Sequence, residues 1–249
     1  MRIAVAGGTG VVGRHTVDAV REAGHDAVVL SRSTGVDLVS GRGLSEALRG
    51  ADAVIDVASI ETLKASAAIE FFTAATGNLL SSAADAGVRH AVLLSIVGID
   101  RIPYDYYAGK VAQEKIVEAS PVPWTIQRAT QFHEFAAQMF ARATLGPLHV
   151  APRARTQPVA AREVGERLAA LAVGEPRGRV ADFAGPREEQ LADMIRAFAR
   201  HQGYRGWVPA LSVPGPQMKG MREGKALPGP DADLGRQTFA EWLGETAHP

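Results

Sequence analysis

The first thirteen residues constrain the fold of this chain more than any later segment does. Ile3–Ala6 is a short apolar run, typical of a strand that is buried on both faces of a sheet. Gly7, Gly10 and Gly13 follow at intervals of three, where a helical pattern begins. Glycines at these places permit a tight turn and let backbone N–H groups approach a bound group closely. The segment therefore predicts a strand, a glycine turn and a helix.

The same turn predicts a ligand. Free backbone amides and the positive end of the following helix favour a pyrophosphate, so a dinucleotide is the natural occupant. A purely structural turn is the alternative, but a position between a strand and a helix is the context that nucleotide binding requires. The residues that we expect to contact the cofactor here are Gly7, Thr9, Gly10, Val11, Val12 and Gly13.

Strand and helix patterns alternate along the first half of the chain. Further strands are predicted at 27–30, 36–38, 53–57, 91–95 and 124–127, with helices at 11–23, 44–48, 106–119 and in an alanine-rich stretch that ends at residue 86. Mostly apolar strands that alternate with helices predict an α/β fold whose parallel sheet is covered on both faces. We expect the doubly wound Rossmann order 3-2-1-4-5-6.

The composition changes in the second half, where 13 of the 14 prolines lie at or beyond residue 121. Helices are predicted there at 162–173, 188–201 and 236–243, but regular alternation weakens. We interpret the chain as a single domain, 1–249, in which residues from about 129 to 249 contribute a small substrate lobe.

Charge and composition narrow the function. The 27 basic and 27 acidic residues give a formal net charge of zero, and no basic run suggests a nucleic-acid groove. Cysteine is absent and no histidine pair has metal-ligand spacing, so we expect no metal site. There is no apolar stretch of membrane-spanning length, and the N-terminus leaves no room for a signal peptide. We therefore expect a cytoplasmic protein with a small-molecule substrate.

The end of the second strand predicts which dinucleotide binds. NAD-binding folds usually place a carboxylate there, whereas this chain has Ser31, Arg32 and Ser33. A guanidinium can pair with a 2′-phosphate, and the flanking hydroxyls can donate to it. We therefore expect NADP(H) in preference to NAD(H), with a solvated Arg32 in a turn as the alternative.

Two later dipeptides are also expected at the cofactor. Asp37 is placed to accept from the adenine amino group and Leu38 to wall the base, although a turn-capping aspartate is an equal alternative. Ala58 and Ser59 end the strand at 53–57, beside the switch point where ligands bind, and we expect their backbone to line the ribose.

A serine, a tyrosine and a lysine form the candidate catalytic group. Tyr106 and Lys110 are four residues apart and share a helix face, so the ammonium is expected to lower the pKa of the phenol. The phenol then exchanges a proton with a carbonyl oxygen, and Ser95, at a strand end, hydrogen-bonds the same oxygen. The alternative interpretation is that Tyr106 and Lys110 only form part of an exposed helix face. Tyr107 has Val111 as its i+4 partner and is expected to pack in the core.

These segments resemble the atypical short-chain dehydrogenase/reductases, in their NmrA-like NAD(P)H-binding branch. The residues that carry the resemblance are 6–13, 31–33, 95–100, 106–110 and 123–132. The resemblance implies the fold and the cofactor, while the branch includes both reductases and cofactor-sensing regulators. The interval from Ser95 to Tyr106 is short for the family's better-known enzymes, so Ser95 is also a candidate cofactor contact.

The resemblance also implies roles for residues near the nicotinamide. Lys110 is expected to reach the nicotinamide ribose as well as the phenol. The segment after the strand at 124–127 passes the nicotinamide in related folds, and a lone histidine such as His133 is more often structural or capping than catalytic. The residues expected to line the substrate pocket are Ile96, Val97, Gln131, Phe132 and His133.

Three functions fit these patterns. The leading hypothesis is an NADPH-dependent reductase of a ketone, aldehyde or quinone. The second is an NADP(H)-sensing binding protein of the NmrA-like type, without turnover and with a protein partner. The third is a nucleotide-sugar epimerase or dehydratase, which usually needs a longer substrate domain than remains here.

Overall fold

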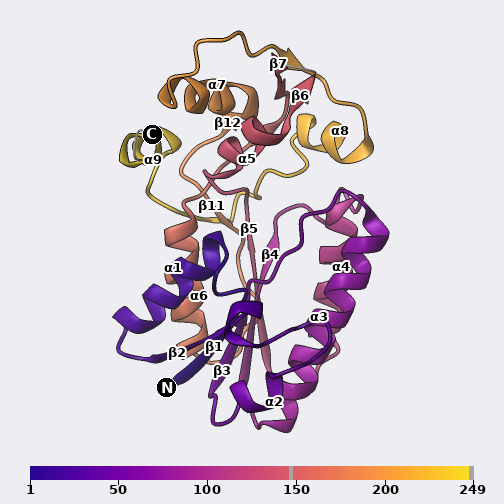
Figure 1. Ribbon diagram of the computed structural model, residues 1–249, viewed down its shortest axis with the longest axis vertical. Coiled ribbons are helices and arrows are strands. Elements are labelled where there is room, and N and C mark those ends of the chain that lie inside the picture. The colour runs from indigo at the N-terminus through magenta and orange to yellow at the C-terminus, as the bar shows by residue number, and fades with distance from the viewer. Residues whose placement is uncertain (146–147, 247–249) are drawn as a thin grey trace.

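The computed structural model describes residues 1–145 and 148–246, and a parallel sheet runs through its lower part (Figure 1). The strand order is β14-β11-β5-β4-β3-β1-β2, and β10 also pairs with β5. The strands are β1 (Arg2–Ala6), β2 (Asp26–Leu30), β3 (Ala53–Asp56), β4 (His90–Ile96), β5 (Trp124–Ala129), β10 (Gly178–Arg179), β11 (Phe183–Ala184) and β14 (Asp233–Leu234).

Helices cover both faces of this sheet (Figure 1). On one face lie α1 (Val11–Glu22) and α6 (Ala161–Val173), against which Ile3 and Ile55 pack. On the other face lie α2 (Leu44–Ala47), α3 (Ala65–Asp85) and α4 (Tyr106–Glu118), against which Val54 and Leu93 pack. Because successive residues of a strand point to opposite faces, both sets must be apolar, which explains the continuous apolar runs in the sequence.

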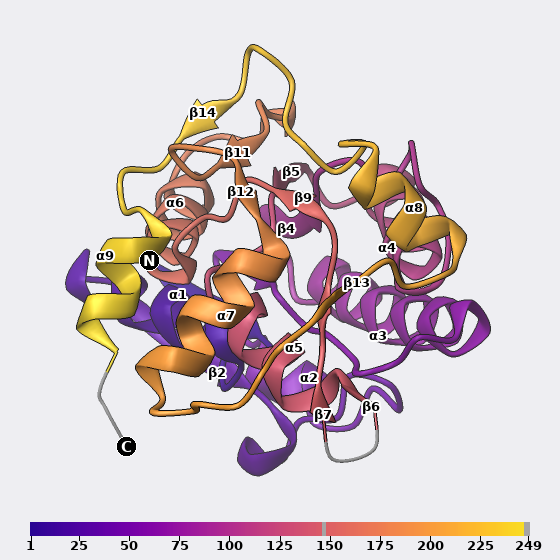
Figure 2. The same ribbon diagram turned by 90° about the horizontal axis from the view of Figure 1, so that it is seen from above.

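A smaller lobe lies beyond the carboxyl ends of the strands (Figures 1 and 2). Its helices are α5 (Phe135–Arg142), α7 (Leu191–His201), α8 (Pro216–Arg222) and α9 (Phe239–Glu245). Two-residue strands connect them: β6 (Thr144–Leu145), β7 (Leu148–His149), β8 (Ala151–Pro152), β9 (Arg155–Thr156), β12 (Glu189–Gln190) and β13 (Ala210–Leu211). A core of its own, which includes Ile99, Tyr107, Ile195 and Met221, joins this lobe to the start of α4. The chain returns from this lobe to the sheet layer twice, first as α6, β10 and β11, and again as β14 between α8 and α9.

The predicted doubly wound parallel sheet is confirmed, and the strands up to β5 follow the expected order except that the third is missing; β11 and β14 extend the sheet beyond β5. Residues 36–38 do not form the predicted third strand. The backbone turns there, because Gly35 and Gly41 have φ of 84° and 76° and the N–H of Asp37 donates to Arg42 O at 2.9 Å. The helix predicted at 188–201 begins at Leu191.

The helix predicted at 236–243 begins later, at Phe239. Its N-cap is Thr238, whose hydroxyl accepts from the N–H of Glu241 at 3.2 Å, while the Glu241 carboxylate accepts from the N–H of Thr238 at 2.8 Å. This reciprocal pair satisfies two backbone donors at the helix start and therefore sets the boundary.

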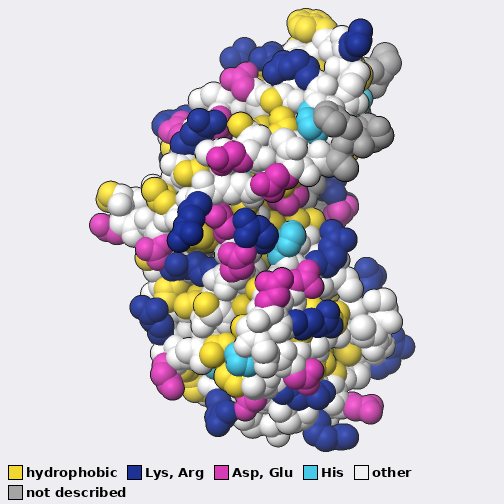
Figure 3. Space-filling view, turned by 90° about the vertical axis from the view of Figure 1, so that its left-hand side faces the viewer, with side chains coloured by type: hydrophobic (Ala, Val, Ile, Leu, Met, Phe, Trp, Pro, Cys, Tyr) yellow, Lys and Arg dark blue, Asp and Glu magenta, His cyan; other side chains and the backbone are white. Residues whose placement is uncertain are grey.

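Charged side chains of both signs are interspersed over the face drawn in Figure 3. Within residues 1–145 and 148–246, none of the helices has the length and apolarity that crossing a membrane demands.

Candidate functional site

The glycine turn between β1 and α1 is closed by backbone contacts. The N–H of Gly10 donates to Gly7 O at 2.9 Å, and Gly7 has φ of 79°. A Cβ on Gly13 would lie 2.1 Å from Gly7 O, so only glycine permits this crossing of the helix start over the turn. Gly10 is the N-cap of α1, and no side chain among the described residues caps it.

This turn fits a pyrophosphate. Thr9 and Gly10 are exposed, and the uncapped first amides of α1 point to the carboxyl edge of the sheet. Val12 is buried in the core, so it offers a ligand only its backbone, and Val11 is partly buried beside it. A dinucleotide would be held by the backbone of residues 7–13, as the glycine spacing predicts.

A short 3₁₀ helix, Arg32–Thr34, follows β2 and presents polar groups at the same edge. The Ser31 and Ser33 hydroxyls are 2.8 Å apart, and the Arg32 side chain between them is exposed. A guanidinium beside two hydroxyls fits a phosphate ester, which is the group that distinguishes NADP(H) from NAD(H).

Asp37 has the role of a turn-capping residue in this structure. Its carboxylate accepts from the N–H of Val39 at 3.0 Å, and hydrogen bonds from Ser40 and Val39 hold its pKa below the usual range. Leu38 is partly buried and packs against the core between the sheet and α2 and α3. The alternative interpretation of Asp37 therefore describes its side chain in the present conformation.

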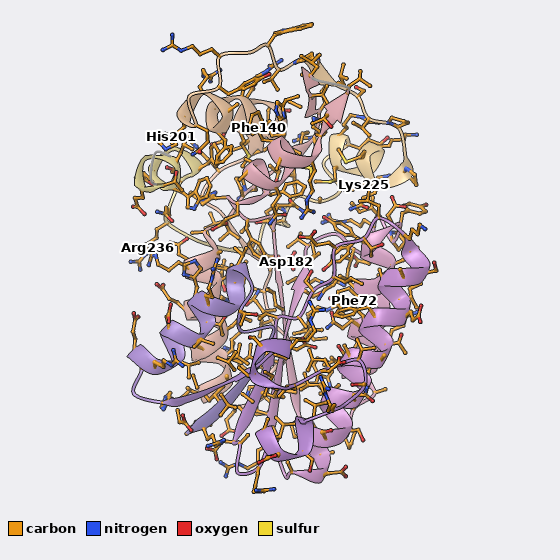
Figure 4. All side chains as sticks on the ribbon, in the orientation of Figure 1. Phe72, Phe140, Asp182, His201, Lys225 and Arg236 are labelled. Atoms are coloured by element: carbon orange, nitrogen blue, oxygen red, sulfur yellow. The ribbon has the colours of Figure 1, made fainter. Side chains whose placement is uncertain are left out.

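Tyr106 is the first residue of α4 and its phenol lies 2.8 Å from the hydroxyl of Ser59. Its ring meets Phe72 of α3 edge-to-face, with 5.6 Å between centroids, and Figure 4 labels Phe72 on this side of the sheet. Burial raises the pKa of Tyr106 most, Asp56 raises it further, and the Ser59 hydrogen bond opposes both. The phenol is therefore protonated at neutral pH.

A short series of contacts joins this phenol to the glycine turn. A Cβ on Gly7 would lie 2.9 Å from the backbone of Ala58, so the turn packs directly on the segment that leaves β3. The next residue, Ser59, holds Tyr106. The glycine turn and the phenol are thus at the same edge of the sheet, and Ala58 and Ser59 connect them: Ala58 packs against Gly7, and Ser59 contacts Tyr106.

Lys110 does not act on Tyr106 in the expected way. Its side chain is 4% exposed, and its ammonium donates to Leu94 O at 2.7 Å and to the side-chain oxygen of Gln113. Burial lowers the pKa of Lys110 to about 8, against the attraction of Asp56 and Glu114. The predicted lowering of the Tyr106 pKa is not seen: burial raises that pKa, and the ammonium directs its hydrogen bonds to Leu94 O and Gln113.

A buried polar cluster holds Lys110 in place. Gln113 donates to Asp56 Oδ2 at 3.0 Å and to Thr76 Oγ1 at 2.8 Å, and Thr76 donates to the same Asp56 oxygen at 2.9 Å. Asp56 is the last residue of β3, and the sequence signal for this cluster is a carboxylate within an apolar strand. Such a group needs polar partners in the interior.

No hydrogen bond joins Ser95 to Tyr106 within the described residues, where the phenol is bonded to Ser59. Ser95 is 1% exposed, and its hydroxyl faces the Glu114 carboxylate, whose pKa it helps to lower. Glu114 is two helical turns beyond Tyr106 on α4 and forms a bidentate pair with Arg128, at 2.9 and 2.8 Å. Within the described residues no hydrogen bond therefore links the three predicted catalytic side chains: the phenol is bonded to the exposed Ser59, whereas Lys110 and Ser95 are buried.

The residues predicted to line the substrate pocket are mostly interior. The Gln131 side chain donates to the Tyr107 phenol at 2.9 Å and accepts from Thr156 Oγ1 at 2.7 Å. Tyr107 packs in the core, as predicted, and burial raises its pKa to about 12. Val97 is fully buried, whereas Ile96 and Phe132 are partly buried.

His133 is a structural residue, and its expected place in the pocket is wrong. Its side chain is fully buried, its Nε2 lies 3.1 Å from Gln237 O, and its ring contacts Phe239 and Trp242 of α9. Burial lowers its pKa to about 4. The ring therefore attaches the C-terminal helix and is neutral at physiological pH.

The structure adds one feature that the sequence did not indicate. Asp105, directly before Tyr106, is the one non-glycine residue with positive φ in the described part of the chain, at 51°. Such a conformation costs about 1–3 kcal/mol and persists only where its surroundings impose it. Strain of this kind is found at functional sites, and here it lies beside the one phenol at the sheet edge that contacts Ser59.

Together, the parallel sheet, the glycine turn and the uncapped start of α1 define a dinucleotide-binding protein of the Rossmann class. The sequence profile of a family described as NAD(P)H-binding matches residues 7–161, and the chain belongs to that family. A search of curated proteins finds no significant match.

Solved structures with this fold include epimerases and reductases. A nucleoside-diphosphate-sugar epimerase from Staphylococcus aureus has a TM-score of 0.70 and 14% identity, covering 98% of this chain and 100% of its own. An NADPH-dependent quinone oxidoreductase from Escherichia coli has a TM-score of 0.68 and 14% identity, with 97% and 98% covered. A Citrobacter triphenylmethane reductase has a TM-score of 0.67 and 15% identity, with 93% and 92% covered. At these identities the likeness shows the fold, and these neighbours belong to the atypical reductase and epimerase group.

Proposed function

We propose that this protein is an NADPH-dependent reductase of a small ketone, aldehyde or quinone, with Tyr106 as the proton donor. The observation that carries the proposal is the phenol of Tyr106, held by Ser59 at the edge where the glycine turn opens. Burial raises its pKa, so the phenol carries its proton at neutral pH, as a proton donor in reduction must.

The cofactor, when bound, supplies the hydride. The backbone of residues 7–13 would hold its pyrophosphate, and Arg32 with the Ser31 and Ser33 hydroxyls, which lie 2.8 Å apart, would hold the 2′-phosphate. Tyr106 then gives its proton to the carbonyl oxygen of the substrate. The quinone oxidoreductase and the dye reductase among the structural neighbours support a reductase.

A cofactor sensor is the second candidate, and the position of Lys110 favours it. A tyrosine whose neighbouring ammonium is bound to Leu94 O and Gln113 lacks the partner that would ease proton exchange. Chain length does not exclude the epimerase hypothesis, since the Staphylococcus aureus protein is covered over its whole length.

The test is NADPH oxidation with a panel of ketones, aldehydes and quinones, followed by Tyr106→Phe. A reductase loses about 10²–10⁴ in turnover while its NADPH affinity is unchanged. Tyr107→Phe is the matched control, because it removes a phenol from the adjacent position that the core has buried. No turnover with any substrate, together with different affinities for NADP⁺ and NADPH, would favour the sensor.

A further inference from the structure

We propose that Ser59 is the residue that positions Tyr106 and returns a proton to it from solvent. The proposal rests on the proposed function, in which Tyr106 gives up a proton in each turnover. It concerns the side chain of Ser59, beyond the backbone contact with ribose that the sequence predicts.

The geometry around the phenol supports this role. The Ser59 Oγ lies 2.8 Å from the Tyr106 oxygen, a distance at which either hydroxyl can donate. Ser59 is exposed, whereas the ring of Tyr106 is partly buried between Phe72 and Tyr107. Ser59 is thus a polar group that both contacts the phenol and is exposed at the protein surface.

The other polar groups near Tyr106 are committed to the interior. On α4, Lys110 is bound by Leu94 O and Gln113, and its ammonium lies 4.9 Å above the ring of Phe72 on α3. On β3, the Asp56 carboxylate accepts from Ala58, Thr76 and Gln113. Neither charged group has a hydrogen bond to the phenol in the described part of the chain, so Ser59 is left as the partner that can exchange a proton with it.

The backbone fixes the two ends of this contact. Ala58, next to Ser59, packs against Gly7 of the nucleotide turn, where a Cβ would lie 2.9 Å away. Asp105, next to Tyr106, has φ of 51°. Because both flanking residues are held by the fold, the 2.8 Å contact between the two hydroxyls needs little ordering of flexible chain.

The proton transfers balance over one turnover. The O–H bond of Tyr106 breaks and the proton forms an O–H bond on the carbonyl oxygen of the substrate. The Ser59 hydroxyl proton moves to the phenolate oxygen, and a solvent proton replaces it on Ser59. Both side chains return to their neutral forms, and one proton is taken from solvent for each carbonyl reduced.

The decisive experiment compares Ser59→Ala, Ser59→Thr and Ser66→Ala. Ser66 is an exposed serine at the start of α3 and serves as the matched control. Turnover and NADPH affinity are measured for each variant. The titration of Tyr106 is followed in cofactor-free protein by NMR of ¹³Cζ-labelled tyrosine, with Tyr106→Phe to assign the signal.

Ser59→Ala is expected to raise the pKa of Tyr106 and to lower kcat by about tenfold or more, with unchanged KM and NADPH affinity. Ser59→Thr, which keeps the hydroxyl, is expected to restore both the pKa of Tyr106 and kcat. An unchanged kcat in Ser59→Ala overturns the proposal, whether or not the Tyr106 titration moves. Absence of turnover in the unmodified protein overturns the proposed function and this role with it, so the two failures are distinguished.

Discussion

The ammonium of Lys110 donates a 2.7 Å hydrogen bond to the carbonyl oxygen of Leu94, inside the protein and not at the edge of the sheet. The i+4 spacing from Tyr106 places both residues on one helix face, but it does not decide where a long side chain ends. Asp56 and Gln113 supply polar partners in the interior, and the ammonium lies among them. The lysine is therefore part of the packing between β3, β4 and α4.

We predict that Lys110→Met destabilises the fold without retuning the phenol. The change leaves Leu94 O and the Gln113 side-chain oxygen without their donor, which costs about 1–3 kcal/mol of unfolding free energy. Denaturant unfolding measures the loss, and Lys115→Met on the exposed face of α4 is the control, expected within about 0.5 kcal/mol of the unmodified protein. The Tyr106 titration should stay where it is. A shift equal to that of Ser59→Ala would return the tuning role to Lys110.

The fold could be predicted because its determinants are local. Apolar strands, the glycine turn and helix starts such as Tyr106 are recognised from neighbouring residues, and the structure confirms them. The strand predicted at 36–38 does not form, because glycines with positive φ on both sides bend a segment whose residues favour a strand. The two-residue strands of the lobe have no periodicity to detect.

The candidate site was harder to predict because its contacts are not local. Ser59 and Tyr106 are 47 residues apart, and Gln113 and Asp56 are 57 apart. Which hydroxyl meets the phenol depends on how β3 and α4 are placed by the sheet, and no spacing along the chain reports that. Asp56 was visible as a carboxylate in an apolar strand, but its partners were not.

Gly10→Val should abolish NADPH binding and keep the protein folded. A Cβ at Gly10 meets Gly7 O at 3.2 Å, a close contact that a small shift of the turn relieves, and φ of −75° suits any residue, so we expect the protein to stay folded. The added side chain would occupy the space before the uncapped helix start where the pyrophosphate binds. Calorimetric titration with NADPH and a melting curve measure the two effects.

The control for this change is Gly77→Ala, in α3, where a Cβ has open space around it. It should bind NADPH normally and gain roughly 0.5–1 kcal/mol of stability. If folded Gly10→Val bound NADPH as the unmodified protein does, the cofactor site would have to lie away from this turn.

Arg32 should determine the preference for NADPH over NADH. One charge-assisted bidentate contact to the 2′-phosphate, at about 1.5–3 kcal/mol, gives a ratio of dissociation constants of about tenfold or more. Arg32→Asp should remove or invert that ratio, whereas Arg49→Ala, an exposed arginine after α2, should leave it unchanged. Equal dissociation constants in the unmodified protein would refute the preference.

The acid limit of stability should depend on His133. Burial lowers its pKa from 6.5 to about 4 in the folded protein, so between these values the unfolded chain binds a proton that the folded chain does not. Stability from this group is therefore present above pH 6.5 and is lost as the pH falls toward 4. A difference of one between the folded and unfolded pKa corresponds to about 1.4 kcal/mol. The unfolding free energy therefore falls by about 3 kcal/mol over this pH range.

Replacing the ring isolates this contribution. His133→Phe keeps the aromatic contacts with Phe239 and Trp242 but cannot bind a proton, so its unfolding free energy should fall less than that of the unmodified protein between pH 6.5 and 4. His25→Asn, near the N-terminus, retains His133 and should keep the full loss. Because the ring is buried against α9 and away from solvent, His133→Phe should also keep its turnover at neutral pH. If the two proteins lost unfolding free energy in parallel as the pH falls, the folded state would bind a proton at His133 as readily as the unfolded chain does. If His133→Phe lost turnover, the ring would have to contact the substrate.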